Sequence, residues 1–156
     1  MLHKATLEEL SEIQKGFKLY VDEGHFTYIR HDYIVRSIEA KEVFYDNGVI
    51  AIIRQMKRAG RIGNFRYGAG AWHIHKFLSL DKKNTVAPFV FMRNFLDEYV
   101  KCGLVFCTVH ISNLLSIGFC KAIGFKVVGD ISWSDGTIPG VVLALNRSEG
   151  FISQLC

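Results

Sequence analysis

The hydrophobic residues of the first 40 positions recur at helical spacing. Thr6 precedes Glu9 by three residues, and this pair can form a capping box in which each side chain bonds the other residue's amide. Apolar residues then follow at steps of three and four, so they line one face of a helix. They are Leu7, Leu10, Ile13 and Phe17. The pattern predicts a helix from Thr6 to about Tyr20 and a less regular helix from about Asp32 to Ala40.

The next residues alternate as strands do. Asn47 and Gly48 separate two apolar runs within residues 43–53, and Asn-Gly readily adopts the positive φ angles of a tight hairpin turn. A further alternating run follows a glycine-rich segment. We therefore predict a hairpin over residues 43–53 and another strand from Ala71 to Leu78.

Helix and strand signals alternate after residue 80. Pro88 fits the first turn of a helix, where its missing amide costs nothing, and we expect that helix to end near Lys101. The continuous apolar run Leu104–Val109 is typical of a strand that is covered on both faces.

A short helix is expected next. Asn113 is a suitable N-terminal cap, the helix runs through Ala122, and Gly124 can end it in a left-handed turn.

Two strands complete the pattern, Phe125–Ile131 and Val141–Leu145. Gly136 and the Pro139-Gly140 pair are interpreted as the turns between them. The predicted order is strand, two helices, three strands, helix, strand, helix and two strands.

The composition fits one folded domain. The chain has 156 residues, of which 49% are hydrophobic and 22% charged, enough apolar material for a core and too little charge for a disordered chain. No apolar run reaches the roughly 18 residues of a membrane span, and no apolar signal segment follows Met1. We expect a single domain over residues 1–156 in a soluble, cytoplasmic protein.

The four cysteines show no C-x-x-C spacing, so neither a disulfide framework nor a zinc site is indicated. They are Cys102, Cys107, Cys120 and Cys156. Free thiols are the expectation.

The net charge of +4 is concentrated in one glycine-interrupted segment. Its basic residues are Arg54, Lys57, Arg58, Arg61 and Arg66. A solvated hairpin or mobile loop explains such a run, because Lys and Arg keep loops hydrated. The alternative is a flap that faces an anionic ligand.

His73 and His75 share one face of the strand 71–78, since strand side chains alternate with period two. Histidine titrates near neutral pH, so either residue can act as a general base. A surface pair or two core histidines are the alternatives. No carboxylate at ligand spacing completes a metal site, so we expect none.

The residues from Asn113 to Phe125 carry a recognisable motif. The run Asn113-Leu-Leu-Ser-Ile-Gly-Phe119-Cys120-Lys-Ala-Ile-Gly-Phe125 follows the pattern N-x-x-A-x-x-F-Y-x-x-x-G-F. With the element order, this motif resembles the GCN5-related N-acetyltransferase (GNAT) superfamily, including its small bacterial and phage members. The resemblance implies an α/β (α+β) fold with a mixed, mostly antiparallel sheet of about seven strands, splayed between strands 71–78 and 104–109 and flanked by about four helices.

The resemblance also implies a cofactor, acetyl-CoA or another acyl-coenzyme A. Family members place a glycine-rich loop before the helix that follows the fourth strand, and its amides hold the diphosphate. The corresponding stretch has Thr85 where the family has glycine, which puts close approach of a phosphate in doubt. The residues implied in cofactor binding are Phe77, Leu78, Lys82, Lys83, Asn84, Thr85, Val86, Ala87, Asn113 and Phe119.

Family chemistry suggests roles for three further residues. His73 or His75 would take a proton from the amine, directly or through water. Cys120 stands where many members have a tyrosine that protonates the departing thiolate, and a thiol can serve as that acid. A buried helix cysteine without a chemical role is the alternative.

The function implied is therefore transfer of an acyl group, acetyl by default, from acyl-CoA to an amine. Small molecules, proteins and nucleic-acid bases are all candidate acceptors, and homodimers are common among similar proteins. Two rivals stay open. One is a non-enzymatic GNAT-fold protein, such as a phage structural or inhibitory module. The other is a nucleic-acid base modifier whose basic segment, 54–66, grips phosphates.

Overall fold

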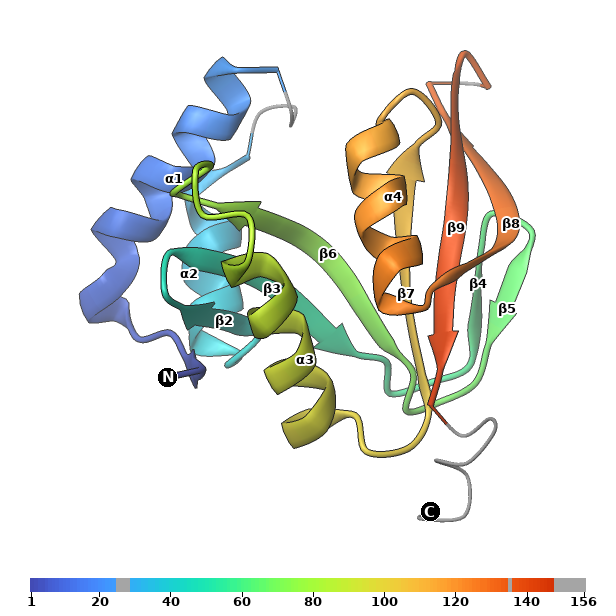
Figure 1. Cartoon of the computed structure of the whole chain (residues 1–156), viewed down its shortest axis with the longest axis horizontal. Coiled ribbons are helices and arrows are strands. Elements are labelled where there is room, and N and C mark those ends of the chain that lie inside the picture. Colours follow the sequence, from blue (N-terminus) through green and yellow to red (C-terminus); the bar gives the residue numbers. More distant parts are fainter. Residues whose placement is uncertain (25–28, 135, 148–156) are drawn as a thin grey trace. The chain divides into compact units, whose positions relative to one another are not determined.

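The computed structural model describes residues 1–24, 29–134 and 136–147. The chain divides into two compact units. The first comprises residues 1–53 and 76–95, and the second comprises residues 54–75 and 96–156. A seven-stranded sheet has the order β1-β2-β3-β6-β7-β9-β8, and β4 and β5 form a separate two-stranded ribbon (Figure 1).

The first unit is built from short strands and three helices. Its strands are β1 (His3–Lys4), β2 (Val43–Asp46), β3 (Val49–Gln55) and the second half of β6 (Trp72–Ser79). A single 3-10 turn, Leu7–Glu9, leads into the first helix. The helices are α1 (Leu10–Asp22), α2 (His31–Glu39) and the first part of α3 (Ala87–Tyr99).

Alternation along the strands divides the core of this unit between two faces. Val43 of β2 packs in one cluster with residues of α1 and α2. The other members of the cluster are Ala5, Ile13, Phe17, Ile34, Ile38, Ile50, Ile52 and Leu78. The next residue, Phe44, points the other way, and its ring meets Phe95 of α3 edge-on at 5.0 Å. Helices therefore cover both faces of β2 and β3.

Local signals mark the starts and turns of these elements, although α1 begins at Leu10, after the 3-10 turn, and not directly after Thr6 as predicted. The Thr6 amide donates to Glu9 Oε1 at 3.1 Å, which is one half of the expected capping box. At the β2–β3 turn, Asn47 has φ 47° and Gly48 has φ 77°, so both residues take the left-handed conformation that the hairpin requires. The predicted hairpin is confirmed.

The second unit combines the β4–β5 ribbon with the remaining strands and α4. The ribbon strands are β4 (Gly60–Ile62) and β5 (Phe65–Tyr67). The other elements are β7 (Leu104–His110), α4 (Leu114–Ile123), β8 (Lys126–Trp133), β9 (Ile138–Asn146) and the first half of β6. β7 and β8 each run antiparallel to β9, while β6 and β7 pair in parallel at Trp72–Ile74.

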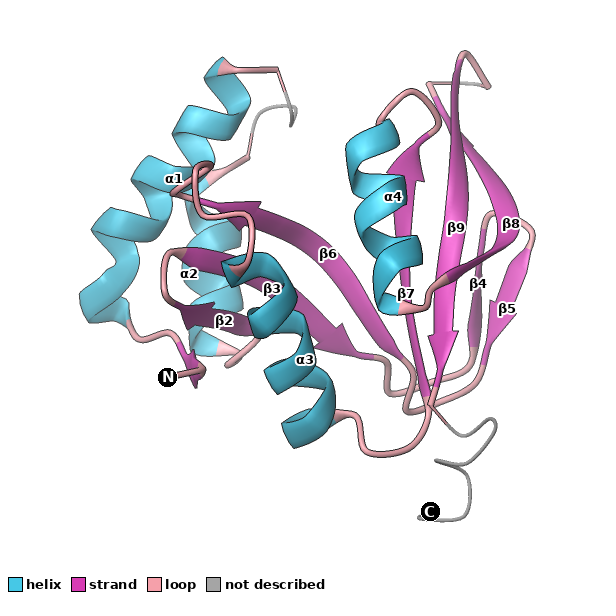
Figure 2. Cartoon of the chain, viewed as in Figure 1, coloured by secondary structure: helices cyan, strands magenta, loops and turns pink. Residues whose placement is uncertain are grey.

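The part of the seven-stranded sheet in this unit is covered by the ribbon on one face and by α4 on the other. The ribbon contributes Ile62, Phe65 and Tyr67 to a cluster around Phe106 and Ala144. Helix α4 lies over β7 (Figure 2). It begins after the expected cap, Asn113, and ends one residue beyond the expected Ala122. Its cap, Asn113, accepts a hydrogen bond from the Ser116 amide, and Gly124 ends the helix at φ 119°.

One turn prediction is wrong. Pro139 and Gly140 lie inside β9, and the β8–β9 connection instead uses left-handed Ser134 and Gly136. Pro139 lies opposite Ser132 of β8, and its carbonyl accepts a hydrogen bond from the Ile111 amide just beyond β7. Because proline has no amide to return a bond, the ladder with β7 ends one residue away, at His110 and Gly140. At Gly140, a Cβ would lie 2.5 Å from the Trp133 ring, so packing requires the glycine.

The helices in the described ranges include none that is long and apolar enough to span a membrane.

Candidate functional site

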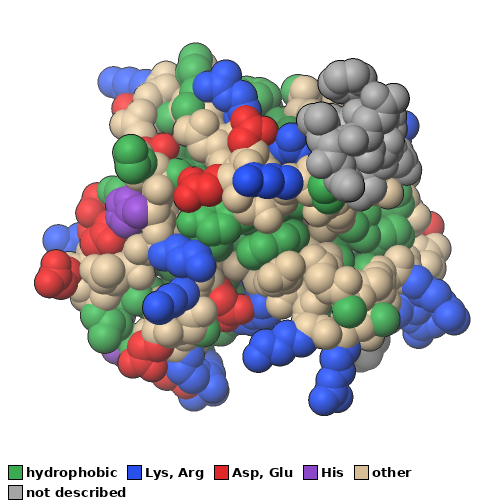
Figure 3. All heavy atoms as spheres, turned by 90° about the horizontal axis from the view of Figure 1, so that it is seen from below, with side chains coloured by type: hydrophobic (Ala, Val, Ile, Leu, Met, Phe, Trp, Pro, Cys, Tyr) green, Lys and Arg blue, Asp and Glu red, His purple; other side chains and the backbone are tan. Residues whose placement is uncertain are grey.

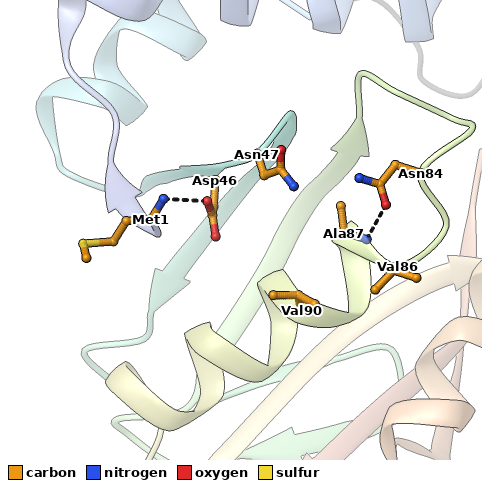
Figure 4. Close-up of a pocket in the computed structure, with 7 residues that line it drawn as sticks. All are labelled: Met1, Asp46, Asn47, Asn84, Val86, Ala87 and Val90. Carbon is orange, nitrogen blue, oxygen red and sulfur yellow. Dashed lines mark hydrogen bonds and ion pairs between the residues drawn. The ribbon is translucent and has the colours of Figure 1, made fainter.

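The loop between β6 and α3 is held by its own side chains. The Lys83 amide donates to Asp81 Oδ1 at 3.0 Å, and the Asn84 amide donates to the Asp81 carbonyl at 3.2 Å. Asn84 Oδ1 in turn accepts from the Ala87 amide at 3.0 Å, at the first residue of α3 (Figure 4). Three of the loop's backbone donors are thereby used within the protein.

Two amides of this loop remain for a ligand. Within the described residues, the amides of Thr85 and Val86 donate no hydrogen bond to the protein, and both residues are exposed. Pro88 has no amide to offer. Because the start of α3 also carries the positive end of the helix dipole, Thr85 and Val86 are the donors that suit an anion.

The two lysines of the loop differ in whether they form an ion pair. Lys82 forms an ion pair with Glu23, and its ammonium lies 5.2 Å from the centre of the Tyr20 ring. Lys83 is exposed and forms no ion pair with any described residue. Lys83 is therefore the side chain that can reach a phosphate without giving up an existing partner.

A hollow of about 470 Å³ adjoins the start of α3 in the first unit. Asn84, Val86, Ala87 and Val90 line one side, facing residues near the β2–β3 turn (Figure 4). The carboxylate of Asp46 lies there, 2.9 Å from the amino group of Met1. The Asp46 carboxylate and the Met1 amino group offset each other, and neither loop lysine lines the hollow, so its lining adds no net positive charge for a diphosphate.

Two residues of β6, Phe77 and Leu78, are predicted to contact the cofactor, and their side chains point to opposite faces of the sheet. Leu78 is only 1% exposed and belongs to the core under α1 and α2, so only its backbone can meet a ligand. Phe77 points to the opposite face, where its ring meets Phe91 edge-on at 5.6 Å.

The two histidines lie together, as the strand alternation predicts. Their rings are 4.0 Å apart, and the His73 ring also stacks on Phe106 at 4.6 Å with an interplanar angle of 10°. Tyr67 of the ribbon stacks on Phe106 as well. The histidines therefore belong to an aromatic cluster on the ribbon side of the sheet. In the part of the chain described, no three metal-ligating side chains come together.

Cys120 has a neighbour that sequence reasoning missed. Its Sγ lies 3.8 Å from Sγ of Cys107 on β7, and both thiols are free. The Cys107 hydrogen bond lowers the pKa of Cys120 against the opposing effect of burial. The pKa of Cys107 rises well above its usual range, through the same hydrogen bond and then through burial.

The free-thiol expectation is wrong at Cys102, which is disulfide-bonded.

The histidines and the thiol pair lie on opposite faces of the sheet. Phe106 and Cys107 are consecutive in β7, so their side chains point in opposite directions. The histidines stack with Phe106, whereas Cys120 contacts Cys107. A base and an acid drawn from these residues must therefore approach a reacting centre from different sides. Asn113, at the start of α4, is occupied as that helix's cap.

Two residues of the basic segment, Arg61 and Arg66, lie in the β4–β5 ribbon, so this part of the segment is a hairpin. Arg61 lies directly opposite Arg66 in its ladder, and both are exposed. Neither they nor Lys57 and Arg58 form an ion pair within the described residues. Lys and Arg side chains also gather along the lower right edge of the face drawn in Figure 3.

No protein-family model matches this sequence, and no curated protein matches it. Solved structures do match. A GNAT-family acetyltransferase from Streptococcus agalactiae is 12% identical, with 96% of each chain covered and a TM-score of 0.71. The structure of yncA from Salmonella typhimurium with its cofactor acetyl-CoA is 15% identical, covering 96% of this chain and 95% of that one, at a TM-score of 0.68.

A third similar structure is Arabidopsis thaliana Naa50 in complex with a bisubstrate analogue. It is 16% identical, covers 94% of this chain and 97% of that one, and has a TM-score of 0.68. The chain therefore has the fold of the GNAT acetyltransferases, as the motif from Asn113 to Phe125 predicts.

Proposed function

We propose that residues 1–156 act as one acyl-CoA-dependent N-acyltransferase domain, with acetyl-CoA as the default donor. The observation that carries the proposal is the start of α3, where the amides of Thr85 and Val86 donate to no described residue. These donors sit in a fold shared with yncA, which was solved with acetyl-CoA. Bound acetyl-CoA would supply the activated acyl group.

The chain's own residues take the following roles in this proposal. The Thr85 and Val86 amides bind the diphosphate with Lys83, and the backbone of Phe77 and Leu78 lines the cofactor arm. Asn84 holds the loop through its bond with the Ala87 amide, and Asn113 caps α4. Lys82 and Phe119 are proposed as further cofactor contacts, as the family resemblance implies.

Proton transfer falls to residues of the second unit. His73 or His75 accepts the proton of the amine, and Cys120 or solvent returns one to the departing thiolate. The lowered pKa of Cys120 eases loss of its proton, which suits an acid.

Calorimetric titration with acetyl-CoA and with desulfo-CoA tests the proposal. Micromolar binding of both ligands is expected, because the diphosphate contacts do not involve the thioester. Absence of heat at millimolar ligand would instead favour the rival in which the fold has lost its cofactor and serves as a binding module.

The ribbon favours a second candidate function, in which the acceptor is nucleic acid. Residues 54–75 contain five Lys and Arg residues and no Asp or Glu. The rest of the chain has 14 Lys and Arg residues against 15 Asp and Glu residues. The whole positive excess thus belongs to one segment. Phosphate contacts made by its arginines would release counterions, so affinity would fall steeply with salt.

Fluorescence anisotropy with a labelled oligonucleotide tests this candidate across a salt series. Replacing Arg61 and Arg66 together by Gln should weaken binding and reduce the salt slope by about two. The matched control replaces Lys15 and Lys18 of α1 in the same way. Absence of binding at low salt, or equal loss in both double variants, would eliminate the nucleic-acid acceptor.

A further inference from the structure

Cys107 and Cys120 are brought together by two well-anchored elements. Cys107 lies in β7, which pairs with β6 on one side and β9 on the other, and it is only 6% exposed. Cys120 lies in α4, whose start is fixed by the Asn113 cap and whose end is fixed at Gly124. The 3.8 Å between the sulfurs is therefore a property of the fold.

The two thiols are unequal in a way that suits sequential reaction. Cys120 is the more accessible of the pair. It is also the one whose thiolate is favoured, because its hydrogen bond with Cys107 lowers its pKa. Redox-active cysteines share these properties: an accessible thiolate that attacks, beside a second thiol that resolves the product.

We propose that Cys120 and Cys107 form a thiol–disulfide exchange site whose substrates are low-molecular-weight disulfides. Cys120 Sγ attacks one sulfur of the small disulfide, whose S–S bond breaks, and the first small thiol leaves as a thiolate that takes up a proton. Cys107 then loses its proton and attacks Cys120 Sγ, which expels the second small thiol.

The two steps balance. Both cysteines are oxidised to one disulfide, and the small disulfide is reduced to two thiols. Bond formation requires the sulfurs to close from 3.8 Å to about 2.0 Å, a small side-chain adjustment. The site depends on the reduced pair alone, so it stands whether or not the chain transfers acyl groups.

The test treats the full chain with oxidised glutathione under native conditions, then alkylates free thiols and digests with chymotrypsin. Leu114, Leu115 and Phe119 lie between the two cysteines, so cleavage there leaves the disulfide joining two peptides. The expected product in the unmodified sequence is the Cys107–Cys120 linked pair, which mass spectrometry identifies. This measurement needs no variant.

Two variants separate the roles. Cys107→Ala should stop at a glutathionyl adduct on Cys120, and Cys120→Ala should leave Cys107 reacting at least about tenfold more slowly. Circular dichroism checks that each variant is folded. Full alkylation of both cysteines after treatment would overturn the proposal, and so would a glutathionyl adduct that persists on Cys120 in the unmodified sequence.

Discussion

Asn84 Oδ1 accepts a hydrogen bond from the amide of Ala87, 3.0 Å away, at the start of α3. A protein side chain thus accepts from an amide that the family resemblance implies for binding a diphosphate. The loop retains the amides of Thr85 and Val86 for that purpose, so the proposed cofactor contact is narrower than the family pattern implies.

Replacing Thr85 by Gly should tighten acetyl-CoA binding several-fold. The Thr85 side chain is exposed and makes no hydrogen bond within the described residues, so its removal costs no packing. Without a Cβ, the backbone allows closer approach of a phosphate. Calorimetry compares the two proteins, with Thr85→Ala as the control that keeps the Cβ. Unchanged or weaker binding in the glycine variant would contradict the obstruction.

Replacing Asn84 by Ala should lower the free energy of unfolding by about 1 kcal/mol, the usual cost of losing a side-chain acceptor at a helix start. Urea denaturation measures the difference. Asn84→Asp is the matched control, because aspartate also accepts a hydrogen bond and its charge is favourable at this helix end. Equal destabilisation by both changes would show that the hydrogen bond is not the cause.

If His73 or His75 is the general base of the proposed reaction, its replacement by Gln should reduce acetyl transfer by about 100-fold or more, the range expected for loss of such a group. His73→Gln and His75→Gln identify which of the two residues carries the role. His110→Gln is the control, because His110 is exposed at the end of β7 and bonds Ser112 instead. If both His73→Gln and His75→Gln transfer acetyl groups as fast as His110→Gln, the two histidines are only packing residues of the Phe106 cluster.

Local chemistry explains which parts of the fold were predictable. The Asn47-Gly48 turn and the Asn113 and Gly124 ends of α4 depend on neighbouring residues, and all were predicted. Pro139-Gly140 resembles a turn by the same local rules. It lies in a strand because Gly140 makes room for the Trp133 ring, a contact that only the folded sheet creates.

The residues of the candidate site were largely predictable from the sequence, but the contacts between them were less so. Strand alternation placed His73 and His75 on one face, and the structure agrees. Cys107 was missed because its contact with Cys120 depends on how α4 folds back over β7. The hydrogen bond that the Ala87 amide donates to Asn84 follows a common local pattern, but the family motif implies the same amide as a ligand donor.

Replacing Arg66 by Glu should raise the free energy of unfolding by a few tenths of a kcal/mol. Arg66 faces Arg61 across the ribbon, and like charges in directly opposed positions are destabilising whereas opposite charges attract. Urea denaturation at low and high salt measures the effect, which salt should diminish. Lys57→Glu makes the same charge change outside the cross-strand pair and should give a smaller gain. A larger gain from Lys57→Glu would mean that net charge, not pairing, is responsible.

Stability should depend on pH through His3. Its pKa is raised above 6.5, first by the hydrogen bond with the Met1 carbonyl and then by Glu9, whose carboxylate lies 2.9 Å from Nε2. The folded state therefore holds the proton more tightly than the unfolded state. Protonated His3 therefore adds to the free energy of unfolding. This contribution is complete below pH 6.5 and is lost as the pH rises through the raised pKa of His3.

Urea denaturation of the unmodified sequence and of His3→Gln, at a series of pH values, isolates this contribution as a difference. The difference should favour the histidine at low pH and shrink as the pH rises through the raised pKa. Glu9→Gln is a second probe, because glutamine keeps an acceptor for the Thr6 amide but removes the charge that helps hold the proton. A difference that is flat across the pH series would show that His3 is not linked to folding.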